Sequence, residues 1–204
     1  MSTLTFYTNP RSRGQIVRWM LEEVGVPYDT VLLEYGTTMK APEYLAINPM
    51  GKVPAIQHEG TVVTEAAAIC AYLADQFPAA GLAPAPSDPL RGTYYRWLFF
   101  GAGPLEMAAT AKALNWQVAE GQRGMVGFGS LETTLDTLAG ALTHGTWLCG
   151  EQFTAADVYV GSAILWGMQF GTIPRRPEFE SYAARLQARP AAQRAQQLDA
   201  ALLK

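Results

Sequence analysis

The residues whose types and spacing point most directly to chemistry lie in segment 48–56, Asn-Pro-Met-Gly-Lys-Val-Pro-Ala-Ile. Its Asn-Pro and Met-Gly pairs indicate a turn, and residues 53–56 read as a short strand in which Pro54 lacks the N–H of a ladder hydrogen bond. If the Val53-Pro54 bond is cis, the N–H and C=O of Val53 point outward and can pair with an extended peptide. The segment therefore predicts a peptide-binding edge.

Glu65 and Ala66 follow this segment and open a run of residues with helical apolar spacing. We therefore expect both at the N-terminus of a helix, where unpaired N–H groups and the helix dipole favour a ligand carboxylate. A Glu65 carboxylate beside such an anion site suits a zwitterionic ligand. The alternative is that Glu65 only complements the positive end of the helix dipole.

Together, these two motifs resemble the cytosolic glutathione transferase family. The thioredoxin-like domain of that family carries a cis-proline after a valine or isoleucine, and a Glu-Ser pair opens its third helix. The resemblance covers the whole chain and implies an α/β thioredoxin-like N-terminal domain followed by an all-α C-terminal helical domain. Ala66 stands where the family usually has serine, so we expect its hydroxyl contact to the γ-glutamyl carboxylate to be missing and its backbone N–H contact to remain possible.

The family implies an enzyme that conjugates the glutathione thiolate to small apolar electrophiles, with glutathione as co-substrate, no cofactor, and a homodimeric assembly. The alternative enzymatic activity is that of a glutathione-dependent peroxidase or dehalogenase, because such an enzyme uses the same thiolate. A non-catalytic transferase-like binding module is the alternative from another class. The presence of Lys40, Val53-Pro54 and Glu65 argues against the module, which has no need of a glutathione site.

A group that stabilises the thiolate is required, because the reference cysteine pKa is about 8.5. Ser12 lies two residues after Pro10 at the start of the first predicted helix and matches the serine of the serine-class members. Its alternative role is a simple helix cap. Arg13 as a cation, Asn9 as an amide donor and Tyr7 as a phenol near the end of the first strand follow as candidates, in that order.

Two lysines are candidates for the contact with the glycine carboxylate of glutathione. Lys40 opens segment 40–46, which resembles the family segment whose lysine makes this contact, and Lys52 lies beside the edge strand. The alternatives are a solvated loop lysine for Lys40 and a structural turn around Lys52. The predicted glutathione-binding residues are Lys40, Lys52, Val53, Pro54, Glu65 and Ala66.

The electrophile pocket is expected to be lined by apolar side chains that also fit a hydrophobic core. Their richness in aromatic rings suggests an apolar co-substrate but does not specify the natural electrophile. The predicted pocket residues are Pro10, Phe100, Leu105, Trp116, Trp166 and Phe170, with Phe99, Met107 and Met168 as further candidates.

The first domain, residues 1–78, reads as a four-stranded mixed sheet with three helices. Alternation in the first strand, an apolar stripe ended by Gly25 and a second β-branched run indicate an opening βαβ unit. The predicted elements are strand 4–8, a helix from about 12 to 24, strand 28–34, helix 42–46, strands 53–56 and 61–63, and a helix from 66 to about 77.

A proline-rich stretch places the domain linker at residues 79–89, and residues 90–204 read as an all-helical domain. Its first helix should kink or break at residues 101–104, and Thr154 and Asp157 have the layout of a helix N-cap and its N3 partner. The glycines of 121–129 predict a mobile loop or a frayed helix start and not a phosphate site. A further helix is predicted at 131–142, before this cap, and the last two predicted helices are 178–188 and about 191–202.

Composition narrows the partners and the compartment. The formal net charge is −3 and the 15 Lys and Arg are scattered, so no nucleic-acid-binding face is indicated. The chain shows no signal peptide and no apolar run near the roughly 20 residues of a membrane span, which predicts a cytoplasmic protein. Cys70 and Cys149 have neither Cys-x-x-Cys nor metal-ligand spacing, so we expect buried structural thiols and no metal.

Overall fold

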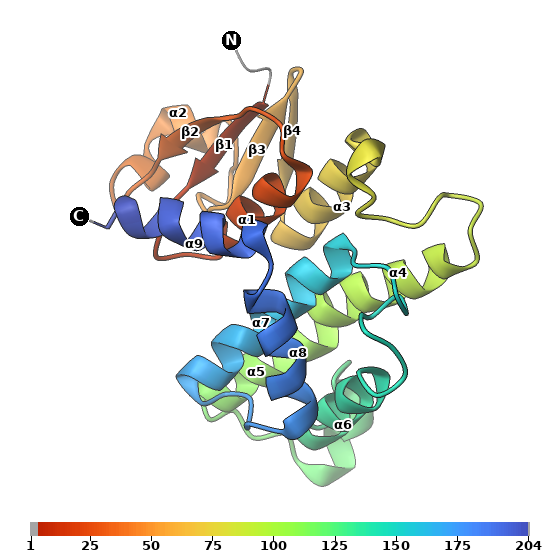
Figure 1. Ribbon diagram of the computed structural model, residues 1–204. Helices are drawn as coiled ribbons and strands as arrows, with labels where there is room; N and C mark the ends of the chain where they lie inside the picture. Colours follow the sequence, from red (N-terminus) through yellow and green to blue (C-terminus); the bar gives the residue numbers. More distant parts are fainter. Residues whose placement is uncertain (1–3, 204) are drawn as a thin grey trace. The chain divides into compact units, whose positions relative to one another are not determined.

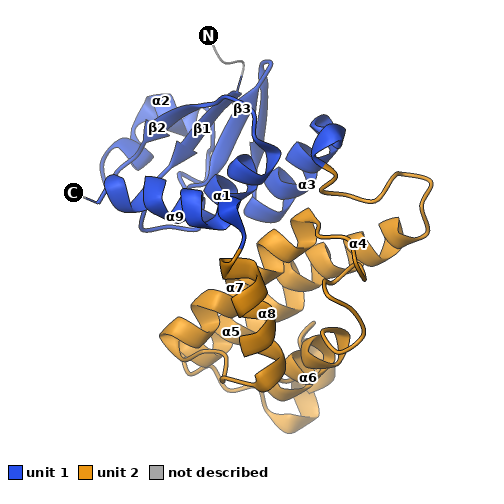
Figure 2. Cartoon of the chain, in the orientation of Figure 1, with its two compact units in different colours: residues 1–80, 189–204 blue, residues 81–188 orange. Residues whose placement is uncertain are grey.

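The computed structural model describes residues 4–203, which form two compact units (Figure 2). Unit 1 contains the chain up to Ala80 and the chain from Arg189 onward, and unit 2 is Gly81–Ala188. The prediction that the chain begins without a signal peptide involves residues 1–3, which lie outside the described residues.

Unit 1 contains one four-stranded sheet in the order β2-β1-β3-β4 (Figure 1). Strands β1 and β2 are parallel, and β3 is antiparallel to both β1 and β4. This confirms the predicted thioredoxin-like mixed sheet. Strand β2 is shorter than predicted, and β3 begins two residues later because Pro54 has no N–H for the ladder. The strands are β1 (Leu4–Thr8), β2 (Asp29–Leu32), β3 (Ala55–His58) and β4 (Thr61–Thr64).

The two faces of the sheet are covered by different helices. On β1, Phe6 lies beneath a side chain of α1, whereas its neighbour Tyr7 packs on Tyr44 of α2, because successive residues of a strand point to opposite faces. A Cβ at Gly14 would collide with the Thr8 hydroxyl, so glycine lets α1 begin close against β1. The helices are α1 (Gly14–Val24), a 3₁₀ turn (Thr38–Lys40), α2 (Pro42–Leu45), α3 (Ala66–Gln76) and a second 3₁₀ turn (Pro78–Ala80).

Unit 2 is helical, as predicted. The expected kink at residues 101–104 is a π-helical turn, Gly101–Leu105, that joins α4 to α5 and contains Pro104. A Cβ on Gly101 would lie 2.9 Å from the ring of Tyr159, so glycine permits the close packing of α7. The elements are α4 (Leu90–Phe100), α5 (Glu106–Ala113), a 3₁₀ helix (Glu120–Met125), α6 (Leu131–Ala141), α7 (Ala155–Phe170) and α8 (Pro177–Gln187).

Helix α7 begins with the predicted capping box of Thr154 and Asp157. The Asp157 carboxylate accepts hydrogen bonds from the N–H of Thr154 (2.9 Å), the N–H of Leu148 (2.9 Å) and the hydroxyl of Tyr182 (2.8 Å). Burial raises the pKa of Asp157, and these hydrogen bonds oppose the shift. The cap therefore also ties the preceding loop and α8 to the start of α7.

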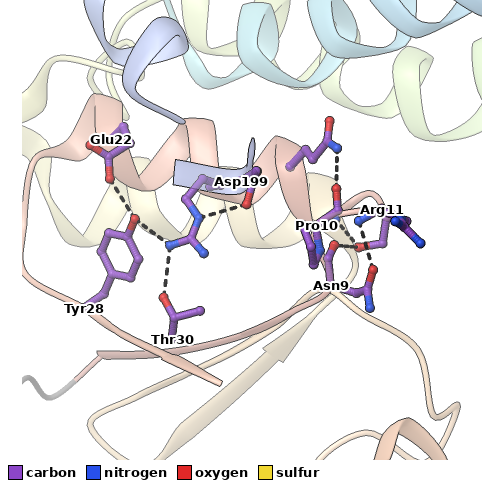
Figure 3. Close-up of polar contacts among 11 residues, drawn as sticks. Asn9, Pro10, Arg11, Glu22, Tyr28, Thr30 and Asp199 are labelled. Atoms are coloured by element: carbon purple, nitrogen blue, oxygen red, sulfur yellow. Dashed lines mark hydrogen bonds and ion pairs between the residues drawn. The ribbon is translucent and has the colours of Figure 1, made fainter. Parts of the chain in front are cut away.

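The C-terminal helix α9 (Pro190–Ala201) differs from the predicted domain division, because it packs on α1 of unit 1 and not within the helical unit. Figure 3 shows Asp199 of α9, Tyr28 and Thr30 around one guanidinium group, each joined to it by a dashed line. Arg18 of α1 is paired with Asp199 at 3.3 Å, and these two residues are only 3% and 5% exposed. Arg18 also donates to the hydroxyls of Tyr28 (2.9 Å) and Thr30 (3.0 Å). A buried guanidinium thus fixes α9 to the sheet domain.

Two further ion pairs hold α9 at its other end. Arg189 makes a bidentate contact with Glu23, at 2.6 and 2.7 Å, and Arg194 lies 3.3 Å from a carboxylate oxygen of Glu22. Bidentate arginine–carboxylate pairs are the stronger and more directional kind. The chain therefore returns to unit 1 directly after α8.

Replacing Asp199 with alanine should lower the free energy of unfolding by about 3–5 kcal/mol, because the buried Arg18 charge would lose its anionic partner. Urea-induced unfolding measures this loss. Glu180→Ala is the matched control, because it removes a pair with Arg175 whose side chains are 69% and 50% exposed, and it should cost less than about 1 kcal/mol. Equal losses in the two variants would contradict the anchoring role of Asp199.

Candidate functional site

The register of the sheet brings three separate chain segments to one of its ends. Tyr7 pairs with Ala55, and Ala55 pairs with Thr64. The C-terminal ends of β1 and β4 and the N-terminal end of β3 therefore lie at the same end of the sheet. The segments that continue from these strands, residues 9–13, 53–54 and 65–66, gather there, so the sheet assembles most of the residues that the sequence predicts for the site.

Val53 presents the predicted free backbone edge. The Val53-Pro54 bond is cis, and within residues 4–203 neither the N–H nor the C=O of Val53 takes part in a hydrogen bond. Pro54 is buried, whereas Val53 is half-buried. An unpaired backbone donor and acceptor on one residue fit an extended peptide ligand that adds alongside the strand.

Glu65 occupies the N-cap position of α3 with φ 65°, a conformation that residues other than glycine adopt only at a cost. Its side chain is exposed and makes no hydrogen bond or ion pair with any described residue. Ala66 is buried at the first position of α3, so its N–H has no partner within the helix. The pair therefore offers a carboxylate for a cation and an N–H for an anion.

The two lysines have different surroundings. The ammonium of Lys40 donates to the carbonyls of Gly51 (2.8 Å) and Met50 (3.2 Å). The Lys52 side chain is exposed and forms no hydrogen bond or ion pair in the part of the chain that the structure describes. Of the two, Lys52 is the one whose ammonium has no hydrogen bond or ion pair with a described residue.

Ser12 lies in the turn that leads from β1 into α1. Its hydroxyl donates to the carbonyl of Asn9 (2.7 Å) and accepts from the N–H of Gly14 (2.9 Å). The side chain is half-buried. The hydroxyl thus stabilises the turn at the positive end of α1, and it donates to a thiolate only after rotating away from Asn9.

The side chain of Asn9 mainly makes hydrogen bonds that hold the loop after β1. Its amide donates to the carbonyl of Leu33 (2.8 Å), and its side-chain oxygen accepts from the N–H of Arg11 (2.9 Å), a contact visible in Figure 3. These bonds link the loop after β1 to the segment after β2. The geometry therefore favours a structural role for Asn9 over that of a thiol-activating donor.

The two remaining thiol-activating candidates lie in contrasting places. Tyr7 points to the α2 face of the sheet, where its ring packs 5.7 Å from the ring of Tyr44 and its hydroxyl lies 3.3 Å from the Gln57 side-chain oxygen. This fits the packing alternative expected for a strand tyrosine. Arg13 is exposed at the N-cap of α1, next to Ser12 in the chain.

The predicted pocket residues differ in how far they are buried. Pro10 is buried in unit 1, and the other five belong to unit 2. Leu105 is completely buried in the core of unit 2, whereas Trp116 and Phe170 are 55% and 73% exposed. Phe100 and Trp166 are half-buried. Leu105 thus takes the core role that the sequence left open.

The cysteines are buried, as predicted. Cys70 is completely buried and Cys149 is 1% exposed. Burial raises the pKa of both thiols, that of Cys149 to about 11, so both remain protonated near neutral pH. No group of three or more His, Cys, Asp or Glu within residues 4–203 is placed to hold a metal ion. None of the described helices has the length and apolar character needed to cross a membrane.

Comparison with known proteins identifies the family. A family model described as "Glutathione S-transferase, N-terminal domain" matches residues 12–76, and one described as "Glutathione S-transferase, C-terminal domain" matches residues 125–190. A glutathione S-transferase from Xanthomonas campestris is 30% identical over 175 residues, which cover 82% of this chain and 84% of the relative. The chain therefore belongs to the glutathione S-transferase family, which confirms the predicted fold class and the glutathione transferase class of enzyme.

Two further similarities show the range within the family. A maleylacetoacetate isomerase from Pseudomonas aeruginosa is 31% identical over 183 residues, covering 84% of this chain and 83% of the relative. A glutathione transferase homologue from Sulfitobacter, solved with bound glutathione, is 26% identical with a TM-score of 0.77, covering 97% of this chain and 99% of that one. The family therefore includes relatives with different named activities.

Sequence reasoning missed two residues that shape the site. Tyr44 and Asn48 both donate to the carbonyl of Lys52, at 2.6 and 2.8 Å. The sequence places Asn48 only in a predicted turn. The signal was present, because an asparagine at the start of a turn commonly bonds the backbone two residues on, and the N–H of Met50 does donate to its side chain.

Proposed function

We propose that this protein binds glutathione at the sheet end of unit 1 and conjugates its thiolate to small apolar electrophiles by addition or substitution. The single observation that carries the proposal is the Glu65 carboxylate, which lies exposed and unpaired among the described residues at the start of α3. A site for a zwitterion needs such a carboxylate, and no described residue pairs with it.

Each polar part of glutathione has a counterpart at this site. The cysteinyl backbone fits the free N–H and C=O of Val53, and the γ-glutamyl carboxylate fits the N–H of Ala66. The γ-glutamyl ammonium fits Glu65. The glycyl carboxylate fits a lysine ammonium at residue 40 or 52. Holding the thiol in one orientation beside an electrophile supplies much of the rate.

We assign activation of the thiol to Ser12. Ser12 is half-buried at the positive end of α1. The N–H of Gly14 donates a hydrogen bond to the Ser12 hydroxyl and polarises it. Asn9 and Tyr7 are less suitable, since their polar groups contact Leu33 and Gln57. Arg13 is the second candidate, because it is exposed beside Ser12 and carries a charge.

Three other activities fit the same binding site. A peroxidase or dehalogenase would use the same thiolate, and the similarity to a maleylacetoacetate isomerase adds isomerisation. Retention on glutathione-agarose separates all of these from a non-catalytic module. Turnover is then compared on an aryl halide, a hydroperoxide, a haloalkane and maleylacetoacetate. We expect the aryl halide to be consumed fastest, with formation of a glutathione conjugate.

We place this activity in the cytoplasm, with detoxification as its general role. The support is that Cys70 and Cys149 are free thiols, as is usual for proteins of a reducing compartment.

Replacing Glu65 with glutamine should weaken glutathione binding by about 1.5–3 kcal/mol, because the ligand ammonium loses its charged acceptor. Calorimetric titration gives the affinity. Glu59→Gln is the matched control: Glu59 is also exposed with a positive φ, but it lies in the β3–β4 turn at the opposite end of the sheet. Unchanged affinity in Glu65→Gln would leave only its helix-dipole role.

Replacing Ser12 with alanine should raise the pKa of the bound glutathione thiol by about one unit, or ~1.4 kcal/mol, because a hydroxyl donor stabilises the thiolate more than the thiol. Turnover at neutral pH should fall more than affinity. Thiolate absorbance titrated against pH measures the shift, and Ser12→Thr, which keeps the donor, should restore it. If the curve of Ser12→Ala overlays that of the unmodified protein while Arg13→Ala shifts it, the role belongs to Arg13.

We also propose a symmetric homodimer. Exposed aromatic side chains on α4, Tyr95 at 41% and Phe99 at 73%, support an apolar contact surface there. Sedimentation at micromolar concentration should give twice the chain mass of 22.2 kDa. The double variant Tyr95→Ser, Phe99→Ser should sediment as a monomer. A single-chain mass for the unmodified protein would refute the dimer.

A further inference from the structure

Thr8 carries a buried hydroxyl that makes no hydrogen bond with any described residue. It is the last residue of β1 and is 0% exposed. Its backbone carbonyl accepts from the N–H of Leu33 (2.9 Å), so only the side chain is left unpaired. A buried hydroxyl without a partner is costly, because the group gives up its hydrogen bonds to water. Such a group requires an explanation other than packing.

The hydroxyls of Thr8 and Ser12 border the same small space at the start of α1. A Cβ built on Gly14, the first residue of the helix, would collide with the side-chain oxygen of Thr8 and lie 3.0 Å from that of Ser12. A larger residue at position 14 would fill this space. Glycine therefore leaves the two hydroxyls as neighbours with nothing between them.

The Ser12 hydroxyl can accept one more hydrogen bond. It donates to the carbonyl of Asn9 (2.7 Å) and accepts from the N–H of Gly14 (2.9 Å). A hydroxyl oxygen has two acceptor lone pairs, so one is still open. The Asn9 carbonyl also accepts from the backbone N–H of Ser12 (3.1 Å). It therefore keeps a donor when the hydroxyl proton of Ser12 turns toward a ligand.

We propose that Thr8 is a positioning residue whose hydroxyl donates to the Ser12 oxygen when glutathione is bound, so that the Ser12 proton faces the glutathione sulfur. The Ser12 oxygen then accepts from Gly14 and Thr8 while its proton is donated to the thiolate. Hydroxyls in such a chain polarise one another, and a thiolate gains more from the donor than a thiol does. The hydroxyl groups only reorient, and each keeps its own proton. The proposal rests on the proposed function, because it needs bound glutathione and the role assigned to Ser12.

Replacing Thr8 with valine removes the hydroxyl and keeps the shape of the side chain. The pKa of the bound glutathione thiol should rise by about half a unit, which lowers the ratio of thiolate to thiol roughly threefold. The shift is smaller than that expected for Ser12→Ala, because Thr8 acts through Ser12. Thiolate absorbance titrated against pH in the glutathione-saturated protein measures it. Thr8→Ser, which keeps the hydroxyl, should give nearly the curve of the unmodified protein.

The double variant Thr8→Val, Ser12→Ala tests whether Thr8 acts through Ser12. Its bound thiol should have the same pKa as in Ser12→Ala alone, because no hydroxyl remains at residue 12 to be positioned. A shift that adds in full to that of Ser12→Ala would mean that Thr8 acts on the sulfur by another path, and would overturn the proposal.

Stability separates positioning from a structural role. Thr8→Val should leave the free protein at least as stable in urea as the unmodified protein, because the lost hydroxyl has no partner there. Thr134→Val in unit 2 is the matched control. Thr134 is also buried, at 3% exposed, but its hydroxyl donates to the carbonyls of Phe128 and Ser130, at 3.0 and 2.9 Å. The control should lose stability and leave the thiol pKa unchanged.

Failure of this proposal differs from failure of the proposed function. If the unmodified protein binds glutathione and the titration curve of Thr8→Val overlays its own, Thr8 has no positioning role and the proposed function stands. The role is also lost if Ser12→Ala leaves the curve unchanged, since Thr8 then has no catalytic hydroxyl to orient. If the unmodified protein does not bind glutathione, the proposed function and the role of Thr8 both fail.

Discussion

The backbone of Val53, which has no hydrogen-bond partner among the described residues, is the constraint on which the candidate site depends. A buried or half-buried N–H and C=O that the protein leaves without a partner must be satisfied from outside, and the surrounding structure keeps them in place. The register of β1, β3 and β4 brings the loop after β1 and the start of α3 to the same edge. The side chains of Lys40, Tyr44 and Asn48 then hold the three carbonyls that precede it.

A second constraint, the burial of the Arg18 guanidinium, ties the end of the chain to this domain. The guanidinium of Arg18 in α1 lies over the ring of Phe6 in the sheet. Its partners are Tyr28, Thr30 and Asp199. A buried charge without an anion is strongly destabilising, so α9 must return to α1. The turn with Ser12 lies at the N-terminus of α1, so the C-terminal helix supports an element of the candidate site.

The polar residues singled out as ligands divide by what they contact. Asn9 and Lys40 donate mainly to backbone carbonyls of neighbouring loops, whereas Glu65 and Lys52 have no polar partner among the residues that the structure describes. Loops near a binding edge expose carbonyls that need donors. Asn9 and Lys40, which are of the right type for ligand contacts, thus bind the loops instead, and we propose that Glu65 and Lys52 face the ligand.

The sequence by itself determined the fold class, nearly all the elements, the Val53–Pro54 edge, the start of α3 and the Thr154–Asp157 cap, because each depends on signals only a few residues apart. Only the tertiary structure decided that α9 belongs to unit 1, that Leu105 is core while Trp116 is exposed, and which lysine is held by the protein. These features depend on pairs such as Arg18 with Asp199, 181 residues apart, and helical periodicity is the same whichever surface a helix covers.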